Sequence, residues 1–199
     1  MKLLNYSLAL AASFVFVIPG LAAAPDSITL DARVLADIRL ATPKSAAAKK
    51  YLGLGDAASF TIPQIKADTV IIEIFNMYCP ICQAEAPSVN ALYRLIEKTP
   101  RLKKKVKLIG IGVGNSPFEV QVFRKKYNVS FPLLPDQKIA IGKAISGPIK
   151  TPTFIAVKTD GRKSLHVYFT HVGKIGPKQL LSAVTAAQSR RQRGSFHGR

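Results

Sequence analysis

Tryptophan is absent from the 199-residue sequence, and cysteine and histidine are rare, with two and three residues. A structural zinc site usually takes four cysteine or histidine ligands, whereas this sequence has one cysteine pair and histidines scattered at positions 166, 171 and 197. A covalently attached haem needs a histidine directly after the second cysteine, and Gln83 stands there. We therefore expect no metal and no cofactor.

Acidic residues are also scarce, since 11 Asp and Glu accompany 29 Lys and Arg, for a formal net charge of +18. With 48% hydrophobic residues the chain can bury a core, so it is not a disordered polycation. The basic residues are scattered, without a helix-turn-helix, RNP or zinc-finger pattern, and we expect no nucleic-acid partner. A solvated basic surface is the simpler interpretation; acidic proteins or an anionic membrane surface are partners that it would attract.

Long hydrophobic runs are missing after the amino-terminal segment. Lys2 precedes an apolar run from Leu8 to Ile18, which Pro19-Gly20 ends before a stretch of small residues. This pattern is typical of a secretory signal peptide. A run of eleven residues is too short to cross a bilayer as a helix, so a permanent anchor is the weaker alternative. We expect a signal peptide over residues 1–23, cleaved or retained, and a periplasmic or otherwise extracytoplasmic protein.

Hydrophobic periodicity and turn residues predict a lead-in over residues 24–57 and a domain over residues 58–188. Within the lead-in we expect helices at Val34–Leu40 and Lys44–Leu52. Strands are expected in the domain at Ser59–Ile65, Thr69–Phe75, Val106–Val113, Phe131–Leu134, Thr153–Val157 and Leu165–Phe169. Helices are expected at Cys82–Lys98, Pro117–Tyr127 and Lys138–Ile145 and from Pro177, with a hairpin turn at Asp160-Gly161 and a basic disordered tail over residues 189–199.

This order of elements predicts an α/β sandwich with a mixed sheet. Strand and helix alternate first, which indicates parallel crossovers, and an antiparallel hairpin and a helix follow. In such folds the reactive groups gather where strands end and helices begin. Both cysteines stand at such a junction, directly after the strand predicted at Thr69–Phe75.

The motif Cys79-Pro80-Ile81-Cys82 brings two sulfur atoms together on the first turn of a predicted helix. Free N–H groups and the helix dipole lower the pKa of a thiol at this end. We therefore expect Cys79 to be the attacking nucleophile and Cys82 to be the shielded, resolving thiol. A purely structural disulfide is the alternative, but it would close too small a loop to stabilise the chain much.

The stretch from Thr69 to Pro87, followed by Thr151-Pro152, resembles the thioredoxin-fold disulfide oxidoreductases, in particular the exported TlpA/ResA-type branch. The segment between Tyr127 and Pro152 is similar to the strand and helix that this branch inserts. The resemblance implies a thioredoxin-like three-layer sandwich with a mixed central sheet and an inserted strand-helix before the cis-proline strand. It also implies that Pro152 is cis near the cysteines and that Thr151 offers its backbone to a substrate.

Two acids fit the acid positions of the family. Glu73 lies six residues before Cys79 and matches the buried acid of ordinary thioredoxins, while Glu85 lies six residues after it and matches the acid of the TlpA/ResA branch. Either carboxyl group is a candidate acceptor for the proton of Cys82. The alternatives are a buried Glu73 paired with a lysine and a Glu85 that only interacts with the helix dipole.

The sequence departs from the family before the first cysteine, where Phe75-Asn76-Met77-Tyr78 replaces the usual tryptophan-containing segment. Tyr78 is then the ring expected to cover the active site, and it joins Pro80, Thr151 and Pro152 as a substrate-binding candidate.

Three functions are consistent with these residues. The leading one is disulfide exchange with exported protein thiols or disulfides, together with a membrane or periplasmic redox partner. A peroxiredoxin-like peroxidase is the second, although its pattern wants a threonine at the position of Asn76. The third is a non-enzymatic basic binding module with an inert, relic disulfide.

Overall fold

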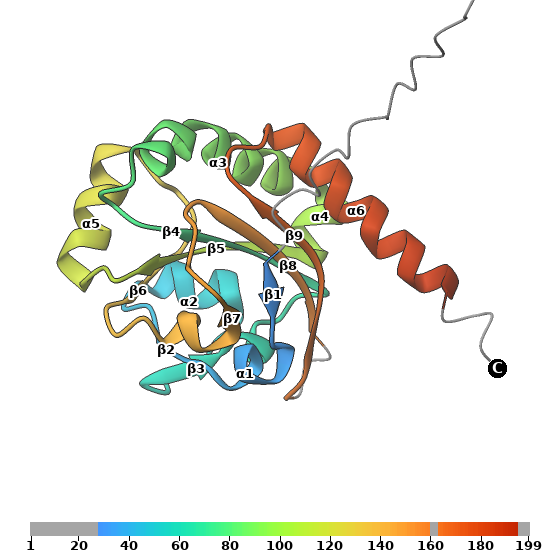
Figure 1. Ribbon diagram of the computed structural model, residues 1–199, viewed down its shortest axis with the longest axis horizontal. Helices are drawn as coiled ribbons and strands as arrows, with labels where there is room; N and C mark the ends of the chain where they lie inside the picture. Colours follow the sequence, from blue (N-terminus) through green and yellow to red (C-terminus); the bar gives the residue numbers. More distant parts are fainter. Residues whose placement is uncertain (1–27, 160–162, 195–199) are drawn as a thin grey trace, which may run out of the picture.

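The computed structural model describes residues 28–159 and 163–194. The predicted signal peptide, the turn at Asp160-Gly161 and the last five residues of the predicted tail lie outside these residues. Figure 1 shows the elements in chain order. The strands are β1 (Thr29–Leu30), β2 (Arg39–Ala41), β3 (Ser59–Thr61), β4 (Thr69–Phe75), β5 (Val106–Val113), β6 (Leu133–Asp136), β7 (Ile145–Ser146), β8 (Thr153–Thr159) and β9 (Leu165–Val172). The helices are α1 (Ala32–Asp37), α2 (Ala46–Leu52), η1 (Ile62–Gln64), α3 (Pro80–Lys98), α4 (Pro100–Lys105), α5 (Pro117–Lys126), η2 (Ala140–Ala144) and α6 (Pro177–Gly194).

The central sheet has five strands in the order β6-β5-β4-β8-β9. β4, β5 and β6 run parallel, whereas β8 and β9 are antiparallel to their neighbours. The predicted mixed sheet is therefore confirmed. β4 is buried at all seven positions, as its continuous run of apolar residues predicts for a central strand.

Two hydrophobic cores lie on opposite faces of the sheet. Helices α3, α5 and α6 bury one face, and their core includes Cys82, Phe75 and Phe154. The lead-in covers the other face, with Leu35 and Leu52 fully buried. The lead-in is therefore a packed layer of the sandwich.

The prediction of a helix over Val34–Leu40 is wrong in its second half. α1 ends at Asp37, and the next residues form β2, in which Leu40 pairs with Phe60 of β3. Asp31 caps α1, since its carboxylate accepts the N–H groups of the first turn. Helix α2 lies within the predicted range and ends at Gly53, whose φ of 68° is the left-handed geometry that favours glycine.

Short elements differ most from their predictions. The strand expected at Ser59–Ile65 stops at Thr61, because Pro63 lies in a 3₁₀ turn instead. The helix expected at Lys138–Ile145 is a 3₁₀ helix, and the Asp136 carboxylate accepts the N–H groups of Ala140 and Ile141 at its start. β6, η2 and β7 form the inserted segment before β8.

The last helix continues further than expected. α6 extends to Gly194, so the first part of the predicted disordered tail is helical. Alanine, glutamine and arginine are good helix formers, and no glycine or proline interrupts α6 before Gly194. Within residues 28–159 and 163–194, no helix combines the length and the apolar character needed to cross a bilayer.

Candidate active site

Cys79 is the N-cap of α3. It lies at the end of the loop after β4, and Pro80 follows at the first helical position. The Cys79 Sγ accepts a hydrogen bond from the Cys82 amide at 3.3 Å. As predicted, the first sulfur therefore lies among the free N–H groups of a helix start.

The two thiols have pKa values shifted in opposite directions. Partial burial acts to raise the pKa of Cys79, but hydrogen bonds with the side chains of Thr151 and Cys82 and with the backbone N–H groups of Ile81 and Cys82 outweigh it, and the pKa is lowered. Burial raises the pKa of Cys82 to about 12, and its side chain has no exposed surface. At neutral pH the thiolate population is therefore concentrated on Cys79.

Thr151 and Pro152 lie beside Cys79. The peptide bond between them is cis, as expected, and the Cys79 Sγ donates a hydrogen bond to the Thr151 carbonyl oxygen at 3.3 Å. The Pro152 carbonyl oxygen accepts the N–H of Gly173 at 2.8 Å, which ties this segment to the loop between β9 and α6.

Glu73 is buried in the middle of β4, with 2% of its surface exposed. Its Oε1 has no hydrogen-bond partner within the described residues, and no lysine pairs with it there. Burial, reinforced by the negative charge of Glu85, raises the pKa of Glu73 to about 8. This carboxyl group is therefore largely protonated at neutral pH.

Glu85 is equally buried, at 2% exposure, although it lies on the second turn of α3. Its Oε1 accepts the N–H of Ile175 at 3.1 Å, from the same β9–α6 loop that contacts Pro152. The alternative of an acid that only interacts with the helix dipole is therefore wrong. Glu73 and Glu85 are near enough for their charges to interact.

Tyr78 is 65% exposed. Its hydroxyl donates to the Glu119 Oε1, and the Glu119 Oε2 accepts the Ser116 N–H at 2.7 Å in a capping box at the start of α5. Tyr78 thus extends from the cysteine motif toward the start of α5. Phe118, next to Glu119, is 76% exposed and adds a second uncovered ring at the start of α5.

Several asparagine and glutamine side chains form hydrogen bonds at this site, although the sequence did not predict this role. Asn76 donates to the Val113 carbonyl oxygen and accepts the Tyr78 N–H, and Asn115 accepts the Met77 N–H. Gln83 also donates to the Met77 carbonyl oxygen at 2.8 Å. Asn76 follows the end of β4 directly, and Asn115 stands two residues after β5, which is the signal that could have identified them.

Within residues 28–159 and 163–194, no cluster of three or more His, Cys, Asp or Glu side chains could hold a metal ion. The site consists of two thiols, two buried carboxyl groups and a cis-proline segment around the carboxyl end of β4.

This sheet, with the cysteine pair at a strand–helix junction, defines a thioredoxin-like fold. Solved structures with this fold include DsbF of MTB, with a TM-score of 0.53, 19% identity and coverage of 77% of this chain and 97% of that one. A secreted Mycobacterium tuberculosis disulfide oxidoreductase homologous to E. coli DsbE has a TM-score of 0.51 and 22% identity, and covers 76% of this chain and 97% of that one.

The chain belongs to the Redoxin family, whose model matches residues 39–177. A thiol-disulfide oxidoreductase ResA of Bacillus cereus is 28% identical over 103 residues, which are 51% of this chain and 55% of that protein. ResA of Geobacillus thermodenitrificans is 26% identical over 97 residues, 48% of this chain and 52% of that protein. The chain thus spans about half the length of these curated relatives. The resemblance to the ResA type is confirmed.

Proposed function

We propose that the protein is a thiol-disulfide oxidoreductase that exchanges disulfides with protein substrates through Cys79 and Cys82. The observation that carries the proposal is the opposite shift of the two thiol pKa values, with Cys79 partly exposed and Cys82 buried. An attacking thiol has to be ionised and accessible, whereas a resolving thiol has to be shielded until the mixed disulfide forms.

In the first step, the Cys79 thiolate attacks one sulfur of a substrate disulfide. A bond forms between Cys79 and that sulfur, the substrate disulfide breaks, and the other substrate sulfur leaves as a thiolate. The Cys82 amide, which already donates to the Cys79 sulfur, stabilises the negative charge before the attack.

In the second step, Cys82 loses its proton and attacks the Cys79 sulfur of the mixed disulfide. The substrate leaves with both sulfurs reduced, and the protein keeps a disulfide between Cys79 and Cys82. We propose that Glu73 or Glu85 accepts the proton, since both are buried carboxyl groups on the elements that position Cys82. An ionised Glu73 is a stronger base than an ordinary carboxylate, because its pKa is raised.

Substrate binding is assigned to Thr151, Pro152, Tyr78 and Pro80. Tyr78 and Pro80 are exposed beside the reactive sulfur, and the Thr151 carbonyl oxygen contacts that sulfur. A substrate backbone laid along Thr151 would bring its own sulfur to Cys79. The tyrosine hydroxyl is held by Glu119, so the ring is positioned before a substrate arrives.

We further propose that the chain acts outside the cytoplasm, after export by the signal peptide of residues 1–23, with residues 24–57 and 58–188 folded together. The amino-terminal pattern supports export. Exported protein thiols are then the substrates, a membrane or periplasmic redox partner restores the reduced form, and the basic surface attracts anionic membranes.

The test is insulin reduction by the dithiothreitol-reduced protein, compared with Cys79→Ser and Cys82→Ser variants. We expect turnover by the wild type, none by Cys79→Ser, and a trapped mixed disulfide with Cys82→Ser. Peroxide consumption in place of insulin reduction would instead indicate a peroxidase. Inactivity in both assays would indicate a binding module, and either result would overturn the proposal.

A further inference from the structure

The central sheet has a notch on its β6 side. β6 pairs with β5 only from Gly110 onward, so the first residues of β5 have no strand beside them there. The Leu108 amide would be unpaired at this edge. Instead, the hydroxyl oxygen of Tyr51, from α2, accepts its hydrogen bond at 2.9 Å. A side chain of the lead-in thus takes the place of a strand.

Aromatic rings line this notch. The rings of Tyr51 and Tyr93 meet edge to face with centroids 5.8 Å apart, and Tyr93 and Phe131 are 5.9 Å apart. Beside them lies a cavity of about 600 Å³ between α2, α5 and β6, elements that gather around one end of the sheet in Figure 1. Sites for small molecules have volumes of roughly 300–1,000 Å³ and mostly apolar walls.

The charged side chains that line the cavity are both basic, namely Lys44 and Arg124. Arg124 is half-buried, and its Nη1 donates to the Val129 carbonyl oxygen at 3.0 Å. No carboxylate pairs with it within residues 28–159 and 163–194. A guanidinium group has five N–H donors in a planar fork, so Arg124 retains donors for a ligand.

We propose that this cavity binds a small carboxylate with an apolar, aromatic tail. The carboxylate would accept paired hydrogen bonds from Arg124, with Lys44 as a second cation at the rim, and the tail would pack against Tyr51, Tyr93 and Phe131. Two features favour this chemistry. The two cations attract a negatively charged group, and the aromatic rings pack favourably against an apolar group. The site goes beyond the proposed exchange function, since neither cysteine lines the cavity.

The experiment is calorimetric titration of the full, reduced protein with 4-phenylbutyrate as the probe. Two control probes each lack one feature: 4-phenylbutan-1-ol lacks the charge and acetate lacks the tail. We expect one site per chain and at least about tenfold weaker binding of each control. Chemical-shift changes should centre on the amides of Tyr93 and Phe131.

Arg124→Gln should weaken phenylbutyrate binding at least about tenfold. Arg94→Gln is the matched control, since Arg94 is exposed on α3 and its loss changes the net charge equally. Arg124→Lys keeps the charge and should bind better than Arg124→Gln, which keeps the test valid if the glutamine variant folds poorly.

Three results would overturn the proposal: no binding at roughly 10 mM probe, equal binding of the alcohol, or an equal loss in Arg94→Gln. Insulin reduction is measured separately, so the cavity and the exchange function can fail independently.

Discussion

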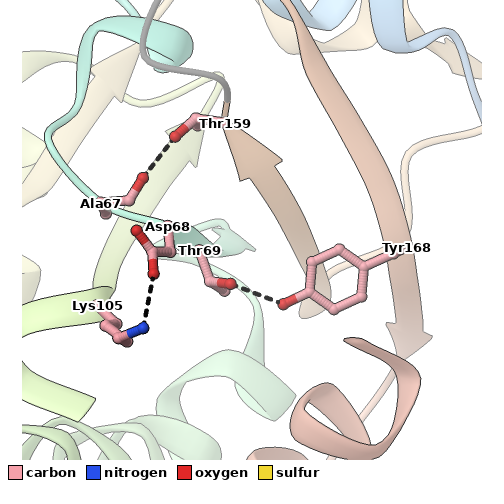
Figure 2. A network of polar contacts seen from close by, with 6 residues as sticks. All are labelled: Ala67, Asp68, Thr69, Lys105, Thr159 and Tyr168. Carbon is pink, nitrogen blue, oxygen red and sulfur yellow. Dashed lines mark hydrogen bonds and ion pairs between the residues drawn. The ribbon is translucent and has the colours of Figure 1, made fainter. Parts of the chain in front are cut away.

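At the amino end of β4, the polar side chains have partners. Figure 2 shows three pairs: the Thr69 and Tyr168 hydroxyls at 3.1 Å, the Asp68 carboxylate and Lys105 ammonium at 3.3 Å, and the Thr159 hydroxyl donating to the Ala67 carbonyl oxygen at 2.6 Å. Each of these contacts holds neighbouring chain segments together.

Toward the carboxyl end of the same strand, two buried ionisable groups differ from these pairs, and one of them, Glu73, has an oxygen with no hydrogen-bond partner within the described residues. The other, Cys82 on α3, is a buried thiol whose pKa is far above neutrality. Burial without a partner costs free energy of folding. One strand therefore combines a stabilising end with a reactive end, and variants at the two ends should affect different properties.

The largest expected contrast lies between the two cysteines. At neutral pH, iodoacetamide should alkylate Cys79 about a thousandfold faster than Cys82, because the pKa gap and the burial of Cys82 act in the same direction. The rates are measured on single-cysteine variants, Cys82→Ser and Cys79→Ser. In denaturant the two rates should become similar, and faster alkylation of folded Cys82 would reverse the assigned roles.

In Glu73→Gln, the free energy of unfolding should depend less on pH than in the wild type. The folded-state pKa of about 8 is above the usual carboxyl value of 4.5, so the contribution of Glu73 to stability is complete at low pH and is lost as pH rises through 8. Between pH 5 and 8 the free energy of unfolding of the wild type should fall by about 3 kcal/mol more than that of the variant. The slope is about 1.4 kcal/mol per pH unit. Urea unfolding at several pH values measures this difference. Parallel curves for the two proteins would show that Glu73 is not protonated when folded.

Tyr168→Phe probes the paired end of β4. Loss of the hydroxyl that contacts Thr69 should cost about 1 kcal/mol of unfolding free energy and leave insulin reduction unchanged. Tyr127→Phe is the control, because no hydrogen bond from the Tyr127 hydroxyl is found within the described residues. Slower disulfide exchange in Tyr168→Phe would show that the amino end of β4 also affects the reaction.

Glu85→Gln should have the smallest effect. Removing a negative charge near the start of α3 should slightly lower the pKa of Cys79 and make the couple slightly more oxidising. Glutamine can still accept the Ile175 N–H, so the loop contact is kept. Ultraviolet absorbance of the thiolate gives the pKa. Glu85→Leu removes both the charge and the acceptor of the Ile175 N–H. Comparing the leucine and glutamine variants therefore distinguishes the effect of the charge from the effect of the loop contact. A raised or unchanged pKa in the glutamine variant would contradict an electrostatic role.

The reactive end was largely predictable from the sequence because its signals are local. β5 begins and ends at the predicted residues, and α5 begins at Pro117 as expected. Cysteine spacing and the junction with a buried strand were enough to place both thiols at the start of α3. The cis bond before Pro152 came from the family resemblance and agrees with the structure.

The contacts of the lead-in were not predictable in the same way. β1, β2 and β3 have two or three residues each, and their pairing depends on partners far along the chain. The burial of Glu85 depends on the β9–α6 loop, which supplies the Ile175 N–H from 90 residues away. Periodicity within one segment carries no information about such distant partners.

The bond between the Tyr51 hydroxyl and the Leu108 amide has a consequence for solubility. An uncovered sheet edge is a template for strands of other molecules, and proteins protect such edges against aggregation. Here one phenol oxygen closes part of the edge, while β2 lies against β6 beside it. A chain shortened to begin at Ser59 would keep both cysteines but would open that edge. We therefore expect the lead-in to limit self-association through this edge of the sheet, separately from any part in disulfide exchange.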